Sequence, residues 1–205
     1  MVFDELDGVC QNVSMTKDSK RDAILEAASE QFRQYGYRKT SMDDIARRLG
    51  ISRASLYSYF DNKDDIFRSA SNAIHAVALQ NAKNQLADTQ SVAVRIEQAL
   101  LARHAPFLNA VVQSPHGGEL FDEYSRLCGD IVVDSHKRFQ AMLATALKTA
   151  SQAGEVNLKA AGVSAVAAAE VLNLSAAGLK HGAPDLAVFK KRVSSFVKVF
   201  VAGME

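Results

Sequence analysis

Cysteine is scarce in this sequence. The 205 residues include Cys10 and Cys128, which are far apart and form no Cys-x-x-Cys pair. Zinc sites and disulfide frameworks need several cysteines at short, regular spacings. The five histidines are scattered and form no His-Glu-x-x-His motif. We therefore expect no metal, no disulfide framework and no cofactor.

Long apolar runs are also missing. A membrane-spanning helix needs roughly 18 or more consecutive apolar residues, and the most apolar segment, 163–179, is interrupted by Glu170 and Asn173. A signal peptide begins with a basic region and an apolar core, whereas this chain begins with the acidic sequence MVFDELDGVC. We expect a cytoplasmic protein.

Proline is rare, and charge of either sign is nearly balanced. Three prolines and 48% hydrophobic residues suit an all-α protein with a sizeable core. The net charge of +1 gives no general affinity for nucleic acid, so DNA binding would depend on a local basic face. Residues 20–63 hold nine lysines or arginines against six acidic residues, which is a small excess.

The most informative segment runs from Thr40 to Lys63 and reads TSMDDIARRLGISRASLYSYFDNK. Its pattern predicts a short helix capped by Ser41, a turn at Gly50 and a second short helix capped by Ser52. Two short helices joined by a glycine-containing turn form a helix-turn-helix, whose second helix enters the major groove of DNA. The segment predicts DNA binding.

The second helix of this motif has an inner and an outer side. Leu56 and Phe60 lie about one turn apart and are expected to face inward, which leaves Arg53 outside for a bidentate contact with guanine. Nearby hydroxyl and ammonium groups suit backbone phosphates. Tyr57 and Tyr59 could instead be half-buried and pack between helices. The candidate DNA-binding residues are Thr40, Ser41, Ser52, Arg53, Ala54, Ser55, Tyr57, Tyr59 and Lys63.

The motif resembles the DNA-binding domain of the TetR family of bacterial transcriptional regulators. The resemblance covers about a quarter of the chain, and Ala54 departs from it, because the family often has glycine or proline there. It implies a three-helix DNA-binding domain followed by a helical domain for effector binding and dimerisation. The residues that carry it are Thr40, Ile45, Ala46, Leu49, Gly50, Ile51, Ser52, Leu56, Tyr57, Phe60 and Lys63.

We expect three parts along the chain. Residues 1–16 show no periodicity and are expected to form an N-terminal extension, 17–63 the helix-turn-helix domain, and 64–205 the helical ligand-binding and dimerisation domain. In the last part, apolar spacing predicts a helix over 63–87 whose stripe is Ile66, Phe67, Ala70, Ile74 and Val77. Further helices are expected from 92 past 107, over 119–153 with a break near Gly129, and over 159–180 and 184–202.

The last two expected helices suit close helix packing. Leu186, Phe189, Val193, Phe196 and Phe200 repeat at 3-4-3-4 spacing, which is typical of a helix-helix seam. The preceding helix is rich in alanine, glycine and serine, so backbones can approach closely. One interpretation is a core within the chain. The family resemblance implies the other, in which these residues form the interface of a homodimer.

The helical body also offers side chains for a ligand pocket. Such pockets are mainly apolar with a few polar groups, so we expect a hydrophobic effector with one or two polar groups. For each residue the alternative is ordinary core packing, and a buried Cys128 would be inert. The candidate lining residues are His104, Phe107, Leu108, Phe121, Tyr124, Leu127, His136, Phe139 and Met142.

Three hypotheses about function remain. The leading one is a TetR-like repressor that binds a palindromic operator in double-stranded DNA and is released by a small hydrophobic effector. The second is a DNA-bound interaction protein that recruits a protein partner and needs no effector. The third, an all-helical enzyme, has little support, because the sequence contains no nucleophile elbow, phosphate-binding glycine loop or catalytic carboxylate pair.

Overall fold

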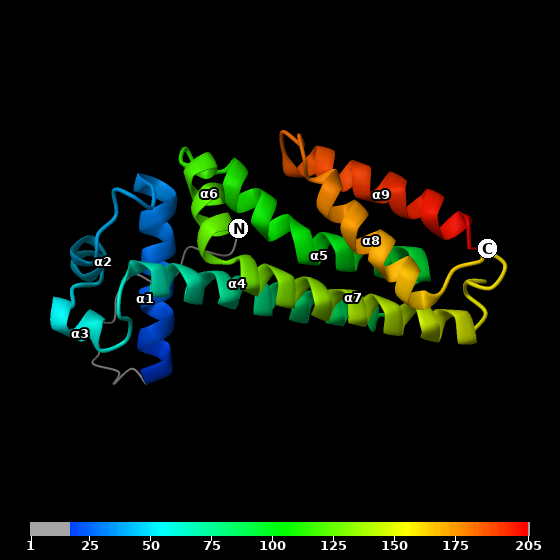
Figure 1. Ribbon diagram of the computed structural model, residues 1–205, viewed down its shortest axis with the longest axis horizontal. Coiled ribbons are helices and arrows are strands. Elements are labelled where there is room, and N and C mark those ends of the chain that lie inside the picture. Colours follow the sequence, from blue (N-terminus) through cyan, green and yellow to red (C-terminus); the bar gives the residue numbers. More distant parts are fainter. Residues whose placement is uncertain (1–16, 205) are drawn as a thin grey trace, which may run out of the picture.

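The computed structural model describes residues 17–204, and these form nine α-helices without any β-strand (Figure 1). The expected all-α architecture is confirmed. The predicted extension, 1–16, lies outside the described residues. The helices are α1 (Lys17–Tyr35), α2 (Met42–Leu49), α3 (Arg53–Tyr57), α4 (Lys63–Leu86), α5 (Val92–Val112), α6 (Gly117–Leu127), α7 (Gly129–Gln152), α8 (Ala165–Leu179) and α9 (Leu186–Ala202).

Helices α1 to α3 gather at one end of the molecule, and the long helix α4 runs from them into the body (Figure 1). Two serines fix the start of α2 and α3, as the sequence predicted. The Ser41 hydroxyl accepts a hydrogen bond from the Asp44 amide, and the Asp44 carboxylate accepts one from the Ser41 amide. Ser52 caps α3 through the amide of Ser55. Gly50 ends α2 with φ of 65°, a left-handed conformation that favours glycine.

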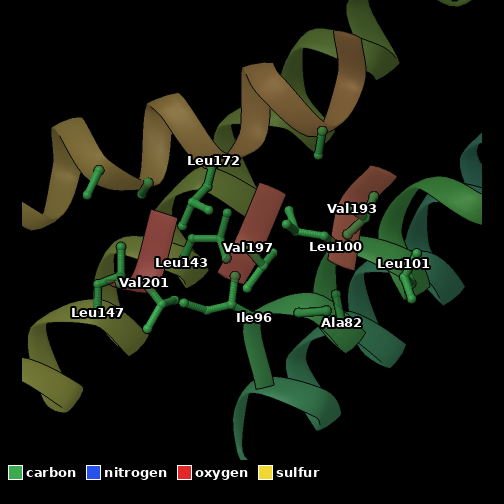
Figure 2. Packing of buried hydrophobic residues seen from close by; sticks show 14 of the residues in the cluster. Ala82, Ile96, Leu100, Leu101, Leu143, Leu147, Leu172, Val193, Val197 and Val201 are labelled. Carbon is green, nitrogen blue, oxygen red and sulfur yellow. The ribbon is translucent and has the colours of Figure 1, made fainter. Parts of the chain in front are cut away.

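The body is built around α5, which packs against α4 and α9, while α7 packs against α4 and α8. Its core is mainly aliphatic, and Leu100, Leu143, Leu147 and Leu172 are fully buried (Figure 2). Truncating one such leucine to alanine typically costs about 2–5 kcal/mol of unfolding free energy. None of the described helices has both the length and the apolar character needed to cross a membrane.

The predicted stripe of α4 is wrong in its second half. Ile74 and Val77 are 40% and 61% exposed. The buried face continues instead through His75, Ala78 and Leu79, which follow the line of contact with α5 and α7. A polar residue therefore occupies a core position that the apolar pattern assigned to Ile74.

Two helix boundaries also bear on the prediction. The break near Gly129 is confirmed, since α6 ends at Leu127 and α7 starts at Gly129. The helix expected over 159–180 begins only at Ala165, because Gly162 adopts a left-handed φ of 67° and Ser164 caps the new helix.

The seam of α9 packs mainly inside the chain. Phe189 and Val193 are fully buried in the body core, together with Val197 and Val201 on the same face. Phe189 and Val193 therefore pack in the core of the chain, as the first interpretation of the seam expected, and the subunit interface stays a prediction for the other three residues. Leu186, Phe196 and Phe200 are only half-buried. The strongly exposed apolar residues of α8 and α9 are Val166, Val171, Leu174 and Val199.

Candidate nucleic-acid interface

Helix α3 presents a short polar surface above a fully apolar support. Leu56 and Phe60 are 0% and 2% exposed, whereas Arg53 lies outside. The Arg53 guanidinium donates to Asp43 at 3.2 Å and to the Tyr57 hydroxyl at 3.3 Å. Arg53 and both of its partners are exposed, and exposed ion pairs contribute little to stability. Arg53 can therefore exchange these partners for a base edge at small cost.

Thr40 lies next to the N-terminus of α2, but its side chain is turned toward the protein. Its side chain is only 3% exposed, and its hydroxyl donates to the Gly36 carbonyl at 2.7 Å. The hydroxyl therefore holds the loop between α1 and α2 and is not presented to a phosphate. Ser41 and Ser52 are exposed but serve first as helix caps.

Lys63 is also turned toward the protein. Its ammonium group donates to the Tyr37 carbonyl at 3.0 Å and to the Thr40 carbonyl at 3.2 Å, and lies 4.4 Å from the centre of the Tyr37 ring. These contacts replace the expected phosphate contact in this structure. Tyr59 is half-buried against the core of the N-terminal domain, as the packing alternative predicted.

Sequence reasoning overlooked the basic side chains of α2 and the loop before it. Lys39, Arg47 and Arg48 are exposed around an open cleft of about 520 Å³ between α1 and α2. Arg47 pairs with Asp44, but no carboxylate of residues 17–204 forms an ion pair with Lys39 or Arg48. The small basic excess of residues 20–63 was the signal that could have identified them.

A sequence model of the bacterial regulatory proteins of the tetR family matches residues 24–70, from within α1 into α4. The chain carries a TetR-family DNA-binding domain. Two curated relatives align over about a quarter of the chain: IcaR of Staphylococcus epidermidis, the negative transcriptional regulator of the biofilm operon icaADBC, and FasR of Mycolicibacterium smegmatis, a transcriptional activator. Each is 40% identical, over 50 and 53 residues. The matches cover only 27% and 24% of the relatives' lengths.

The TetR likeness of the whole chain is one of fold. SmeT, the repressor of the Stenotrophomonas maltophilia multidrug efflux pump SmeDEF, superimposes with a TM-score of 0.66 at 20% identity. The alignment covers 93% of this chain and 91% of SmeT. A complex of SmeT with triclosan gives the same TM-score at 19% identity, over 90% of this chain and 91% of that one. The matched domain is that of bacterial regulatory proteins of the tetR family, and the fold of the whole chain is that of SmeT.

Helix α6 joins the TetR domain to the body. The Arg38 amide donates to Glu119 at 2.6 Å, and the Arg38 guanidinium pairs with Glu123 at 3.2 Å. Arg126 donates to Glu123 at 2.7 Å, which lowers the pKa of that buried carboxyl. On α4, Arg68 pairs with Asp130 at the start of α7. A movement of α6 would therefore disturb the loop that leads into α2.

The candidate effector residues do not form one group. Phe121 is 58% exposed on α6, and Leu127 is partly buried against the core of the TetR domain. Leu108 and Met142 belong to the core of the body, the former buried and the latter partly buried. The remaining candidates make ring contacts where α5 meets α6 and α7: Phe107 contacts Tyr124, and His104 contacts His136 and Phe139.

Two residues at this meeting point were missed. Arg103 is 2% exposed, and its guanidinium carbon lies 5.3 Å from the centre of the Phe107 ring. His75 is buried on α4 and contacts Ser135 at 2.9 Å and the Tyr124 hydroxyl at 2.6 Å. Apolar periodicity cannot find such residues, because it assigns charged and polar side chains to the surface.

Proposed function

We propose that the protein is a transcriptional repressor that binds a palindromic operator as a homodimer. The observation that carries this proposal is the presentation of Arg53 and Tyr57 on α3, above the buried Leu56 and Phe60. A short helix held in this way can place an arginine against a guanine in the major groove. The descriptions of IcaR and SmeT support repression, whereas FasR is an activator, so the sign of regulation needs its own test.

The DNA-binding proposal separates two kinds of contact. Arg53 would read a base, while Lys39, Arg47 and Arg48 would contact phosphates. Arg53→Ala should lose about 1–3 kcal/mol at the selected operator and relax base preference at one position. Arg48→Ala is the matched control, because it should weaken binding to all sequences similarly.

The experiment is selection from randomised duplex DNA, followed by fluorescence anisotropy with the parent and both variants. A reporter gene behind the selected operator then gives the sign of regulation. Equal operator affinity and equal base preference for Arg53→Ala and the parent would refute this assignment of α3.

A second copy of the chain would cover the exposed apolar face of α8 and α9. Its members are Val166, Val171, Leu174 and Val199, next to the half-buried Phe196. The family's operators are expected to be palindromic, and two recognition helices would then stand about 34–36 Å apart on one face of DNA. A dimer through this face would link two half-site contacts and raise the overall affinity.

We further propose that a small organic ligand in the body releases the operator. The support is the group of buried, unpartnered polar atoms at the meeting point of α5, α7 and α8, and the existence of a SmeT complex with triclosan. The ligand must favour one conformation of the dimer, and DNA must weaken ligand binding by the same factor. Calorimetry with free and operator-bound protein tests this reciprocity.

One observation favours the partner-recruiting alternative. Two open clefts, of about 520 and 600 Å³, lie along the TetR domain. A protein partner could dock there without any effector. Operator affinity that stays constant across a chemically varied library of small molecules would support this alternative over ligand release.

A further inference from the structure

Four basic side chains lie near one another in the helical body, and we call them the basic cluster: Arg103 and His104, which are buried, and His136 and Lys180, which are half-buried. Arg103 and His104 are 2% and 1% exposed on α5. The His104 ring lies 6.3 Å from the His136 ring on α7. Lys180 follows α8 as its C-cap residue and is half-buried. Three helices therefore bring positive or potentially positive groups to one buried place.

The polar atoms of this region lack partners. Neither ring nitrogen of His104 has a hydrogen bond, nor has the Nε atom of Arg103, and all three atoms are buried. On α8, Asn173 donates to the His136 carbonyl at 3.2 Å, but its own buried carbonyl oxygen accepts no bond. Buried polar groups in native proteins are nearly always hydrogen-bonded. A bound molecule could supply the hydrogen-bond partners that these atoms lack within the chain.

The cluster also lacks a counter-charge. Within residues 17–204, no carboxylate forms an ion pair with Arg103, His104, His136 or Lys180. Burial, together with the smaller effect of the nearby Arg103, lowers the pKa of Lys180 to about 8. Burial also lowers the pKa of His104 well below its ordinary value, with Lys180 and Arg103 acting in the same direction. The positive charges of Arg103 and Lys180 therefore make protonation of the two histidines less favourable.

An uncompensated buried cation is costly, because desolvation of the charge is not offset by a partner. Hydrophobic residues of similar size would stabilise the fold better. The presence of Arg103 in the core is therefore explained by a bound anion more readily than by packing.

We propose that Arg103, His104 and Lys180 form a buried site for the carboxylate of an otherwise apolar organic acid. The guanidinium would bind the carboxylate in a bidentate manner, and the neutral His104 ring would donate one further hydrogen bond. Phe107 and Phe139 lie beside the cluster and would contact the apolar part of the ligand. An acyl or aryl monocarboxylate fits this surrounding better than a doubly charged phosphate, which would be harder to desolvate.

This inference deepens the proposed function, since it names the chemical class of the effector. The test measures binding of octanoate and phenylacetate to the full-length protein by calorimetry and by thermal unfolding. The neutral octanamide and phenylacetamide are matched control ligands, and inorganic phosphate is the control anion. We expect each acid to bind roughly tenfold to hundredfold more tightly than its amide.

The variants distinguish a binding role from a structural one. Arg103→Met keeps a long side chain but removes the buried charge, so the unliganded protein should melt a few degrees higher while acid binding is lost. A structural arginine would give the opposite change in melting temperature. Lys137→Met, on the exposed face of α7, is the control and should behave like the parent. If Arg103→Met fails to fold, the acid–amide comparison in the parent still decides.

Equal binding of acid and amide, binding of neither, or binding of phosphate alone would overturn the proposed site. Operator affinity is measured separately, with and without octanoate. Acid binding that depends on Arg103 but leaves operator affinity unchanged would keep the site and refute the effector role. If the parent protein without ligand failed to bind an operator, this result would contradict the proposed function but not the carboxylate site.

Discussion

Lys63 allows a clear separation between folding and DNA binding. The sequence placed its ammonium group on a DNA phosphate, whereas the structure places it against the carbonyls of Tyr37 and Thr40. Lys63→Met keeps the length of the side chain but removes the donors. We therefore expect this variant to lose stability in the TetR domain, and to keep the salt dependence of DNA binding.

The structure sets the expected magnitude. The two hydrogen bonds measure 3.0 and 3.2 Å, and each has a charged donor. Such bonds contribute about 1.5–3 kcal/mol when buried. Lys63 is only half-buried, so water can replace part of this interaction. The variant should lose about 1–2 kcal/mol of unfolding free energy.

The assay combines urea denaturation with anisotropy titrations over a range of salt concentrations. Lys39→Met is the matched control, because Lys39 is exposed on the same loop and pairs with no described carboxylate. It should unfold like the parent, and the slope of log affinity against log salt should fall by about one. The opposite pattern, with a stable Lys63→Met of reduced salt slope, would restore Lys63 as a phosphate contact and refute this reasoning.

Three further expectations concern other parts of the chain. Leu174→Glu places a charge in the exposed apolar face of α8 and should shift the protein from dimer to monomer in light scattering; an unchanged mass would refute the interface. Burial lowers the pKa of His75 from 6.5 to about 4. The neutral ring therefore contributes roughly 3 kcal/mol to the free energy of unfolding above pH 6.5, and this contribution is lost as the pH falls toward 4. Urea denaturation should show this loss, and His75→Gln should reduce it. Gly36→Ala should destabilise the protein more than Gly50→Ala, because both have left-handed φ but only the first Cβ would meet Glu119, at 2.7 Å; equal losses in urea would contradict this.

The sequence predicted local features best where one residue has one physical role. The caps at Ser41 and Ser52 and the turn at Gly50 follow from side-chain chemistry and backbone sterics within a few residues. The same holds for the inward positions of Leu56 and Phe60, which the helical period decides. No tertiary information was needed for these assignments.

Roles that depend on a distant partner were harder to predict. A 3-4 seam looks the same whether it packs on its own chain or on a second copy, and α5 turned out to cover Phe189 and Val193. Thr40 and Lys63 stand in the motif for either of two reasons, contact with DNA or support of the loop. Sequence spacing cannot distinguish these, because both uses need the same residue at the same place.

Helix α6 connects the two regions whose function is proposed. On one side Glu123 pairs with Arg38 at the loop before α2. On the other side the Tyr124 hydroxyl bonds His75, whose ring lies 4.5 Å from that of Phe107 beside the basic cluster. A ligand changes operator affinity only by its difference in affinity for two conformations of the protein. Because Glu123 and Tyr124 are adjacent on one rigid helix, a shift that relaxes the contacts near Phe107 also displaces the carboxylate that holds Arg38. The body and the DNA-binding domain therefore both contact α6, and under the proposed function a ligand that favoured one position of α6 would also select one position of α2 and α3.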